Sequence, residues 1–181
     1  MELYKGRPEN TVGRLEREVR VYDLLDSLQI EYTRVDHAPA ATMEDCEAVD
    51  AVLGVKMCKN LFLTNRQQTA FYLLLMPADK PFKTKELSAQ IGSARLSFGS
   101  GEQMEAKLGV TPGSASLMGL MNDREHQVRL LIDRDLLKEN YVGCHPCVNT
   151  ASLKLRWGDV LEKFLPFTGH QPVIVILNGE N

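Results

Sequence analysis

The stretch that decides the fold is Lys59–Pro77, with the sequence KNLFLTNRQQTAFYLLLMP. Two apolar, β-prone runs, Lys59–Thr64 and Thr69–Met76, flank the polar residues Asn65–Gln68. Two such runs on either side of a short polar turn predict a β-hairpin. A proline directly after the second run ends it, because proline cannot donate to a strand ladder. We therefore expect a fold built around a sheet.

Short helices and further strands alternate outward from this hairpin. Apolar spacing, a capping-box-like pair (Thr42 and Asp45) and closing glycines (Gly54, Gly92 and Gly109) predict helices. The predicted helices cover residues 15–28, 42–53, 84–91, 100–108, 134–139 and 157–165. The predicted strands cover residues 30–37, 127–133, 148–155 and 172–177, the last of them buried.

No internal repeat and no linker interrupts this alternation. The pattern predicts one α/β (α+β) domain with a mixed sheet. Residues 1–13 carry Gly6, Pro8, Asn10 and Gly13 without apolar periodicity, so we expect a loose N-terminal strap followed by the domain over residues 14–181.

Composition narrows the class of protein. The 181 residues are 44% hydrophobic and 25% charged, as in a soluble globular protein. The longest apolar run, Ala70–Met76, is far short of the roughly 20 residues of a membrane span. The first twenty residues are polar and resemble no secretory signal, so the four cysteines are expected to be reduced and the compartment to be the cytoplasm.

The charge is unevenly distributed. The whole chain has 21 basic and 24 acidic residues, a formal charge of −3, which argues against a protein that coats nucleic acid through bulk charge. Residues 54–95 contain seven basic and two acidic residues, a balance of 7 − 2 = +5, which leaves −8 for the rest. A polyanion would therefore meet the middle of the chain, although a chance cluster on solvated faces explains the same numbers.

Cys144-His145-Pro146-Cys147 is the most conspicuous motif for chemistry. A C-x-x-C pair can be a redox centre or half of a zinc site. Cys46 and Cys58 lie too far upstream to supply the second half, so structural cysteines are the expected reading. His145 is held by the following proline and is either a functional imidazole or a capping histidine. No G-x-S-x-G is present, which argues against an α/β-hydrolase serine nucleophile.

Four segments taken together resemble a known family. They are Lys59–Leu63 (KNLFL), Arg95–Ser100 (RLSFGS), Leu108–Ser114 (LGVTPGS) and His145–Thr150 (HPCVNT). In this order they are similar to the YbaK and prolyl-tRNA synthetase editing-domain family. The likeness is greatest to the free-standing Ala-tRNA(Pro) deacylases (PrdX or ProXp-ala), and it runs from about Val19 to Leu177.

This resemblance implies a mixed, barrel-like sheet flanked by helices. It also implies an enzyme that hydrolyses the ester between a wrong amino acid, alanine, and the 3′ end of tRNA(Pro), acting in trans on the acceptor end. Such an enzyme is needed because a pocket built for proline cannot strongly exclude a smaller amino acid. The expected partners are tRNA(Pro) and, transiently, prolyl-tRNA synthetase, with no membrane, DNA, metal or cofactor.

The resemblance also assigns roles to residues. Lys59 is the functional lysine, expected to hold the carbonyl or phosphate side of the aminoacyl-adenosine, and His145 lies at the amino-acid pocket. The loop of Gly113, Ser114, Ala115 and Ser116 lines the terminal sugar and the ester. Asn149 is expected to support His145 by hydrogen bonding. Arg95 and Arg66 are expected to contact the acceptor stem.

One departure and three alternatives stay open at this stage. Leu117 stands where the family has the proline that ends its G-x-x-x-P loop, which puts the rigidity of the loop's end in doubt. The alternatives are a deacylase of Cys-tRNA(Pro), a non-catalytic tRNA- or synthetase-binding module of the same fold, and a thiol redox protein built on Cys144 and Cys147.

Overall fold

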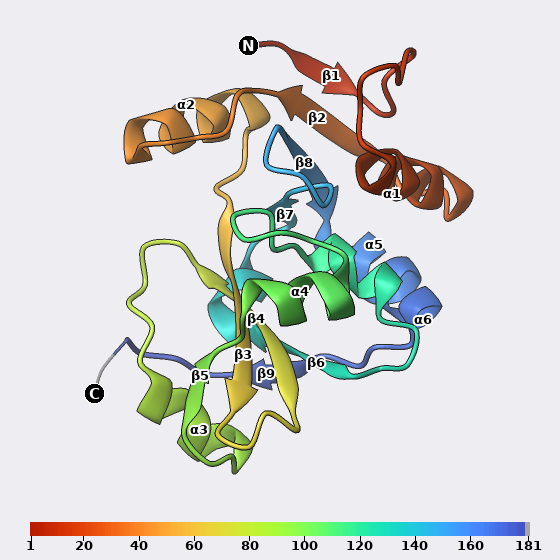
Figure 1. Cartoon of the computed structure of the whole chain (residues 1–181). Helices are drawn as coiled ribbons and strands as arrows, with labels where there is room; N and C mark the ends of the chain where they lie inside the picture. Colours follow the sequence, from red (N-terminus) through yellow and green to blue (C-terminus); the bar gives the residue numbers. More distant parts are fainter. Residues whose placement is uncertain (180–181) are drawn as a thin grey trace.

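A computed structural model describes residues 1–179 of the chain (Figure 1). The predicted hairpin is present: β3 (Cys58–Asn65) and β4 (Phe71–Pro77) pair antiparallel, with Thr64 opposite Phe71. β4 is buried on both faces, which is why its sequence is a continuous apolar run rather than an alternating one.

The hairpin is the centre of a five-stranded mixed sheet. Its order is β5-β3-β4-β6-β9, and β6 and β9 run parallel to their neighbours. The outer strands are β5 (Leu96–Phe98), β6 (Val128–Asp133) and β9 (Val173–Val175). β9 was expected to be buried, but Val173 and Ile174 are 45% and 44% exposed because β9 is an edge strand.

A second, four-stranded antiparallel sheet has the order β1-β2-β8-β7. Its strands are β1 (Leu3–Lys5), β2 (Tyr32–Asp36), β7 (Tyr141–Cys144) and β8 (Ala151–Arg156). β1 pairs with β2, so the expected strap over residues 1–13 is tied down by a strand rather than loose. The predicted strand over 148–155 begins later, because Cys147 has φ +62° and turns the chain.

The sheets do not close into the barrel that the resemblance implied. Within residues 1–179 they are joined by a single bridge between Met57 and Gly143. One face of the five-stranded sheet packs against the four-stranded sheet through one core, and its other face packs against α3 through a second core. Phe62 belongs to the first core and Leu63 to the second, as the alternation of a strand requires.

Most helices begin and end where the sequence predicts. The α-helices are α1 (Glu16–Ser27), α2 (Met43–Leu53), α3 (Thr84–Ile91), α4 (Gly101–Leu108), α5 (Trp157–Asp159) and α6 (Leu165–Thr168). The short helices η1 (Leu117–Asn122) and η2 (Arg134–Lys138) are 3-10, and η3 (Val160–Phe164) is a π-helical turn between α5 and α6.

The expected helix signals are confirmed at α2. Thr42 and Asp45 form the capping box, and Gly54 ends the helix in the left-handed conformation. No helix within residues 1–179 has the length and apolar character needed to cross a membrane.

Candidate active site

A cavity of about 290 Å³ lies along the edge of β3, just beyond the end of β5. β5 pairs only with Leu63, Thr64 and Asn65, so the preceding part of β3 has no strand beside it on that edge within residues 1–179. The cavity is lined by Cys58, Asn60, Leu61, Phe62, Phe98, Gly99, Met104, Pro112, Gly113, Ala115 and His145. It therefore brings together all four segments that carry the family resemblance.

The backbone of β3 is open toward this cavity. In an antiparallel ladder, successive residues bond alternately to either side. Asn65 N–H donates to Ala70 O on the β4 side, while Phe62 O accepts from Gly99 N–H on the opposite side at 2.9 Å. Asn60 has the same parity as Phe62, so its backbone N–H faces the cavity edge and is available to a ligand.

Asn60, which lines the cavity, carries an unsatisfied hydrogen-bond acceptor in its side chain. Its Nδ2 donates to Cys58 O at 3.2 Å, which fixes the orientation of the amide. Its Oδ1 is buried and has no hydrogen-bond partner within the described part of the chain. A buried carbonyl oxygen without a partner costs about 1–3 kcal/mol. A ligand group that donates to Oδ1 would recover that cost, which makes Asn60 a candidate binding residue.

His145 presents one ring nitrogen to the cavity. Its Nδ1–H donates to Ala151 O at 2.8 Å, and Ser152 Oγ lies 3.5 Å from the same nitrogen. A neutral ring that donates from Nδ1 keeps a lone pair on Nε2. Burial lowers the pKa of His145 below its ordinary 6.5, and the nearby His37 lowers the pKa further, while the Ala151 bond opposes both. The imidazole is therefore neutral at pH 7 and able to accept a proton.

The predicted glycine-serine loop forms the wall facing His145. Gly113 has φ +88°, a conformation that favours glycine, and Ala115 lines the cavity. Ser114 and Ser116 are buried, and Ser116 Oγ donates to His145 O, which ties the loop to the histidine. Leu117 is fully buried, and Ser116 caps η1 directly before it. The end of the loop is thus anchored by a core leucine where the family has proline.

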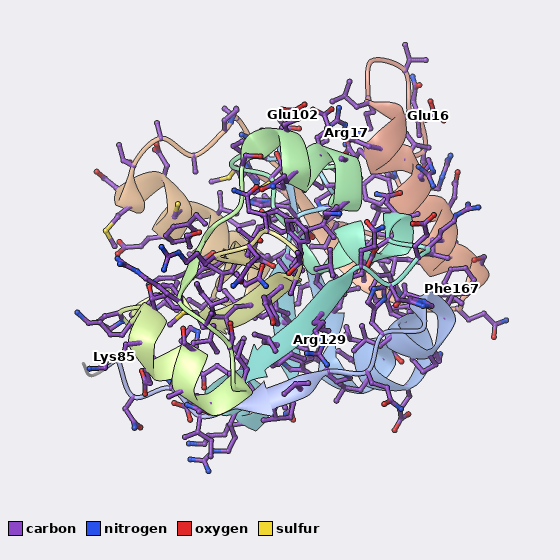
Figure 2. All side chains as sticks on the ribbon, turned by 60° about the horizontal axis from the view of Figure 1, so that its bottom comes forward. Glu16, Arg17, Lys85, Glu102, Arg129 and Phe167 are labelled. Atoms are coloured by element: carbon purple, nitrogen blue, oxygen red, sulfur yellow. The ribbon has the colours of Figure 1, made fainter. Side chains whose placement is uncertain are left out.

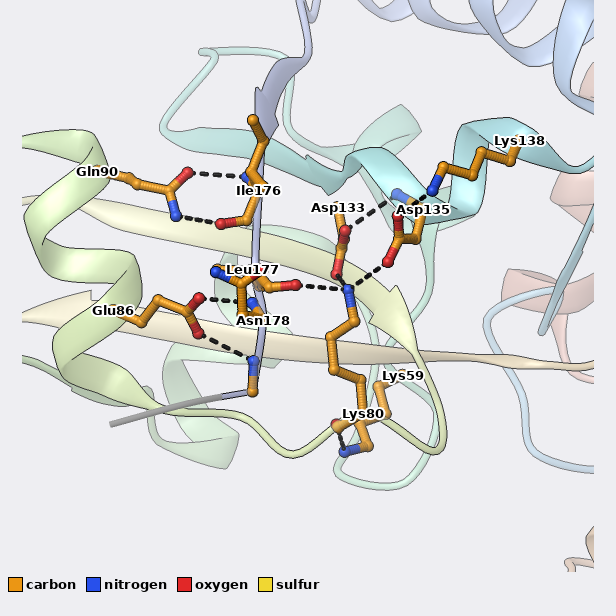
Figure 3. A network of polar contacts seen from close by, with 11 residues as sticks. Lys59, Lys80, Glu86, Gln90, Asp133, Asp135, Lys138, Ile176, Leu177 and Asn178 are labelled. Atoms are coloured by element: carbon orange, nitrogen blue, oxygen red, sulfur yellow. Dashed lines mark hydrogen bonds and ion pairs between the residues drawn. The ribbon is translucent and has the colours of Figure 1, made fainter.

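Lys59 is placed differently from the other predicted catalytic residues. It is not among the residues that line the cavity, and its Nζ donates to Lys80 O at 2.5 Å (Figure 3). Lys80 is itself fixed by Asp133 Oδ2 at 2.6 Å and Asp135 Oδ2 at 2.8 Å. Lys59 follows Cys58 and precedes Asn60 on β3, so its ammonium reaches the cavity edge only by leaving the Lys80 carbonyl.

The expected hydrogen bond between Asn149 and His145 is absent within residues 1–179. The His145 ring bonds to Ala151 O. Asn149 Nδ2 instead lies 3.8 Å from the position that a Cβ on Gly113 would take. The structure thus brings Asn149 to the backbone of the glycine loop.

Arg95 and Arg66 lie outside the cavity, at the turn end of the hairpin. Asn65 pairs with Leu96. Arg66 follows Asn65 and Arg95 precedes Leu96, so the two arginines are neighbours at the next position of this antiparallel ladder. Both are exposed. The positive charge of the segment 54–95 is lower in the fold than the +5 of its sequence, because Lys80 pairs with Asp133 and Asp135 from outside the segment. Ion pairs among residues 1–179 leave Lys59, Arg66, Lys83, Lys85 and Arg95 of this segment unneutralised.

Cys144 and Cys147 are buried, unpaired thiols in the described part of the chain. Burial raises the pKa of Cys147 to about 12 and that of Cys144 above its ordinary value, so neither is a thiolate at pH 7. Within residues 1–179 no group of three or more His, Cys, Asp or Glu side chains is arranged to hold a metal ion. The two cysteines pack around His145 as parts of the core.

Sequence reasoning did not single out Asn60 or Phe98 as site residues, although both stand inside the quoted motifs. Asn60 had a usable signal, since an asparagine inside an apolar strand is a buried polar group that needs a partner. Phe98 had none, because an exposed aromatic residue and a core one look alike in sequence. Ser152 Oγ lies between two histidines, 3.5 Å from His145 Nδ1 and 2.9 Å from His37 Nε2. The sequence could not predict this contact, because it depends on the pairing of β2 with β8.

Comparisons with known proteins agree with this geometry. Residues 37–163 match the model of the aminoacyl-tRNA editing domain. The chain is 34% identical over 146 residues to the prolyl-tRNA editing protein ProX of Acetoanaerobium sticklandii, covering 81% of this chain and 88% of that protein. It is 31% identical to prolyl-tRNA synthetase associated domain-containing protein 1 of Danio rerio, covering 84% of this chain and 83% of that one.

Among solved structures, one described as a candidate trans-editing enzyme for prolyl-tRNA synthetase superposes with a TM-score of 0.66 at 18% identity. The superposition covers 91% of this chain and 99% of that one. At this identity the superposition bears on the fold, and it matches the mixed α+β domain described above. The family model covers more than half of the chain, from His37 past His145 to Lys163. This chain therefore belongs to the aminoacyl-tRNA editing domain family.

Proposed function

We propose that the chain removes alanine from mischarged Ala-tRNA(Pro) by hydrolysing the ester at the tRNA 3′ end. An editing domain of this family is an aminoacyl-tRNA deacylase. What we propose beyond the family's activity is the identity of the tRNA and of the amino acid. The ProX protein, named for prolyl-tRNA editing, supports tRNA(Pro) as the substrate. The KNLFL and RLSFGS segments favour alanine over cysteine.

One observation carries the enzymatic proposal. A cavity of about 290 Å³ is lined by His145, whose imidazole is neutral, by Asn60, whose buried Oδ1 has no partner within residues 1–179, and by Gly113 and Ala115 of the glycine loop. Ligand pockets for drug-sized molecules start at about 300 Å³, so this one is large enough to enclose a small amino acid with its ester but too small to enclose a whole nucleotide.

The chemistry then follows from the atoms present. His145 Nε2 accepts a proton from a water molecule as the water oxygen attacks the ester carbonyl carbon. The bond from that carbon to the ribose oxygen breaks, and the ribose oxygen takes the proton back from the imidazolium. Negative charge on the carbonyl oxygen is stabilised by the backbone N–H of Asn60 and by the Lys59 ammonium once it leaves Lys80 O.

The proposed role of Asn60 is to bind the substrate's α-ammonium group. An aminoacyl ester carries a protonated amine one carbon away from the carbonyl. Asn60 Oδ1 accepts from it and so positions the ester between His145 and the Gly113 loop. Arg95 and Arg66 are proposed to contact acceptor-stem phosphates, and transient association with prolyl-tRNA synthetase remains part of the proposal.

The experiment measures the release of amino acid from Ala-, Cys- and Pro-tRNA(Pro). Release of alanine with little release of cysteine or proline supports the proposal. Release of cysteine alone replaces it with the Cys-tRNA(Pro) deacylase reading. Binding of tRNA without release of any amino acid overturns the enzymatic reading in favour of a binding module. Leu117, which stands where the family has the proline of the loop, is anchored in the core.

A further inference from the structure

Phe98 is an exposed aromatic residue at the mouth of the candidate active site. It ends β5, lines the cavity and is 63% exposed. Exposing a large aromatic ring to water forgoes the favourable burial that such rings usually find. Lysine or serine would serve an edge position better if no ligand covered it, so the exposed ring at this place needs an explanation.

The ring is held in position from behind. Phe82 packs against it edge-on, with the ring centroids 6.1 Å apart and an interplanar angle of 61°. Gly99 follows directly, and its N–H donates to Phe62 O. A Cβ at Gly99 would come within 2.4 Å of the Phe62 ring, so only glycine lets the chain lie this close to β3. Phe98 is therefore a fixed platform rather than a loose side chain.

Its place along β3 suits a nucleoside whose ester lies at His145. Cys58, whose Sγ contacts Gly143 O in β7, is at the His145 end of the cavity, and Phe62 is at the Phe98 end. A strand rises about 3.4 Å per residue, so these ends are about 14 Å apart. An amino acid esterified to a ribose, with the base on the far side of the sugar, extends over a similar length.

Two basic residues stand close in the chain to the two packed rings. Arg95 precedes Phe98 on the same segment, and Lys83 follows Phe82. Within residues 1–179 neither of these cations has an ion-pair partner. Aromatic platforms flanked by cations are how proteins hold single-stranded nucleic acid, with stacking for the base and charge for the phosphates.

We propose that Phe98 stacks on the nucleobase of the last nucleotide at the tRNA 3′ end. The inference rests on the proposed function, because it assumes that the ester of an aminoacyl-tRNA lies at His145. Stacking is tolerant of base identity. Phe98 thus anchors the end of the strand and leaves recognition of the particular tRNA to contacts elsewhere.

The test compares binding of two uncharged tRNAs, one with its complete 3′ end and one lacking the last nucleotide. The wild-type chain should bind the complete tRNA about 5- to 150-fold more tightly. Phe98→Ala should lose that preference and bind the truncated tRNA as the wild type does, while Phe98→Trp should keep it. Because Phe98 is exposed, Phe98→Ala should unfold at the same denaturant concentration as the wild type.

Phe167→Ala is the matched control. Phe167 is 60% exposed on α6, and in Figure 2 it lies across the molecule from Lys85 on α3. This variant should keep the full preference for the complete 3′ end. If Phe98→Ala also keeps it, the inference is overturned. If no amino acid is released from any charged tRNA and the preference still depends on Phe98, the proposed function fails while the nucleobase site stands.

Discussion

Two histidines of this chain lie inside the fold and differ in how their ring nitrogens are used. His170 is buried, with Nε2 2.8 Å from Asp123 Oδ2 and Nδ1 2.9 Å from Thr168 Oγ1. His145 has a partner for Nδ1, the Ala151 carbonyl, and presents Nε2 to a cavity. Both positions are typical of a structural histidine in sequence. The difference teaches that an unused hydrogen-bonding atom facing a cavity, rather than burial or an acidic neighbour, distinguishes the candidate catalytic group.

The largest expected effect is on the rate at His145. His145→Gln should slow deacylation by about 10²- to 10⁴-fold, because the proton acceptor for the attacking water is lost. Single-turnover release of amino acid from charged tRNA measures it. The free energy of unfolding should change little. A variant that deacylates at the wild-type rate would remove His145 from the mechanism and erase the contrast with His170.

Asn60 sharpens the comparison, since it lines the same cavity and its buried Oδ1 is a second atom without a hydrogen-bond partner within residues 1–179. Asn60→Leu should lower kcat/KM by about 10- to 100-fold, the loss expected for a hydrogen bond to a charged ammonium. Its stability should match or exceed that of the wild type, because an unsatisfied buried oxygen is removed. Deacylation kinetics test the expected loss in kcat/KM, and chemical denaturation tests the expected stability. Lost stability together with unchanged kinetics would make Asn60 a structural residue.

His170 should show the opposite pattern. His170→Leu leaves Asp123 Oδ2 without its imidazole partner and should destabilise the fold by about 1–3 kcal/mol. Asp123 still accepts from the backbone N–H groups of Gln127 and Val128, which limits the loss. Urea unfolding measures the change. At a temperature where the variant is folded, its deacylation rate should equal that of the wild type. A slowed rate there would break the division between the two histidines.

The smallest effect is the pH dependence. The pKa of His145 is lowered from 6.5, so the active neutral form is fully present above that value. The rate should fall as pH drops through the folded-state pKa below 6.5, by up to about tenfold per pH unit. Subtracting spontaneous ester hydrolysis at each pH gives the enzymatic profile. His145→Gln should lack this inflection, and an inflection that survives in the variant belongs to another group.

Local signals in the sequence predicted much of the fold. The hairpin, the capping box at Thr42 and the closing glycines at Gly54, Gly92 and Gly109 are confirmed, because each depends on neighbours within a few residues. The wrong predictions share another cause. The exposed face of β9 follows from its place at a sheet edge, and the separate sheets follow from how distant strands pair. Neither is encoded within one segment.

The candidate site divides in the same way. The sequence by itself determined the family, the glycine loop and the histidine before Pro146, since each is a motif of contiguous residues. Only the tertiary structure decided that Lys59 is held at Lys80 O, that Asn149 lies beside Gly113, and that Asn60 Oδ1 has no partner among residues 1–179. The physical reason is that hydrogen-bond satisfaction depends on which groups meet after β3, the Gly113 loop and the His145 loop converge. The spacing of residues within a motif does not predict which groups come together in the folded chain.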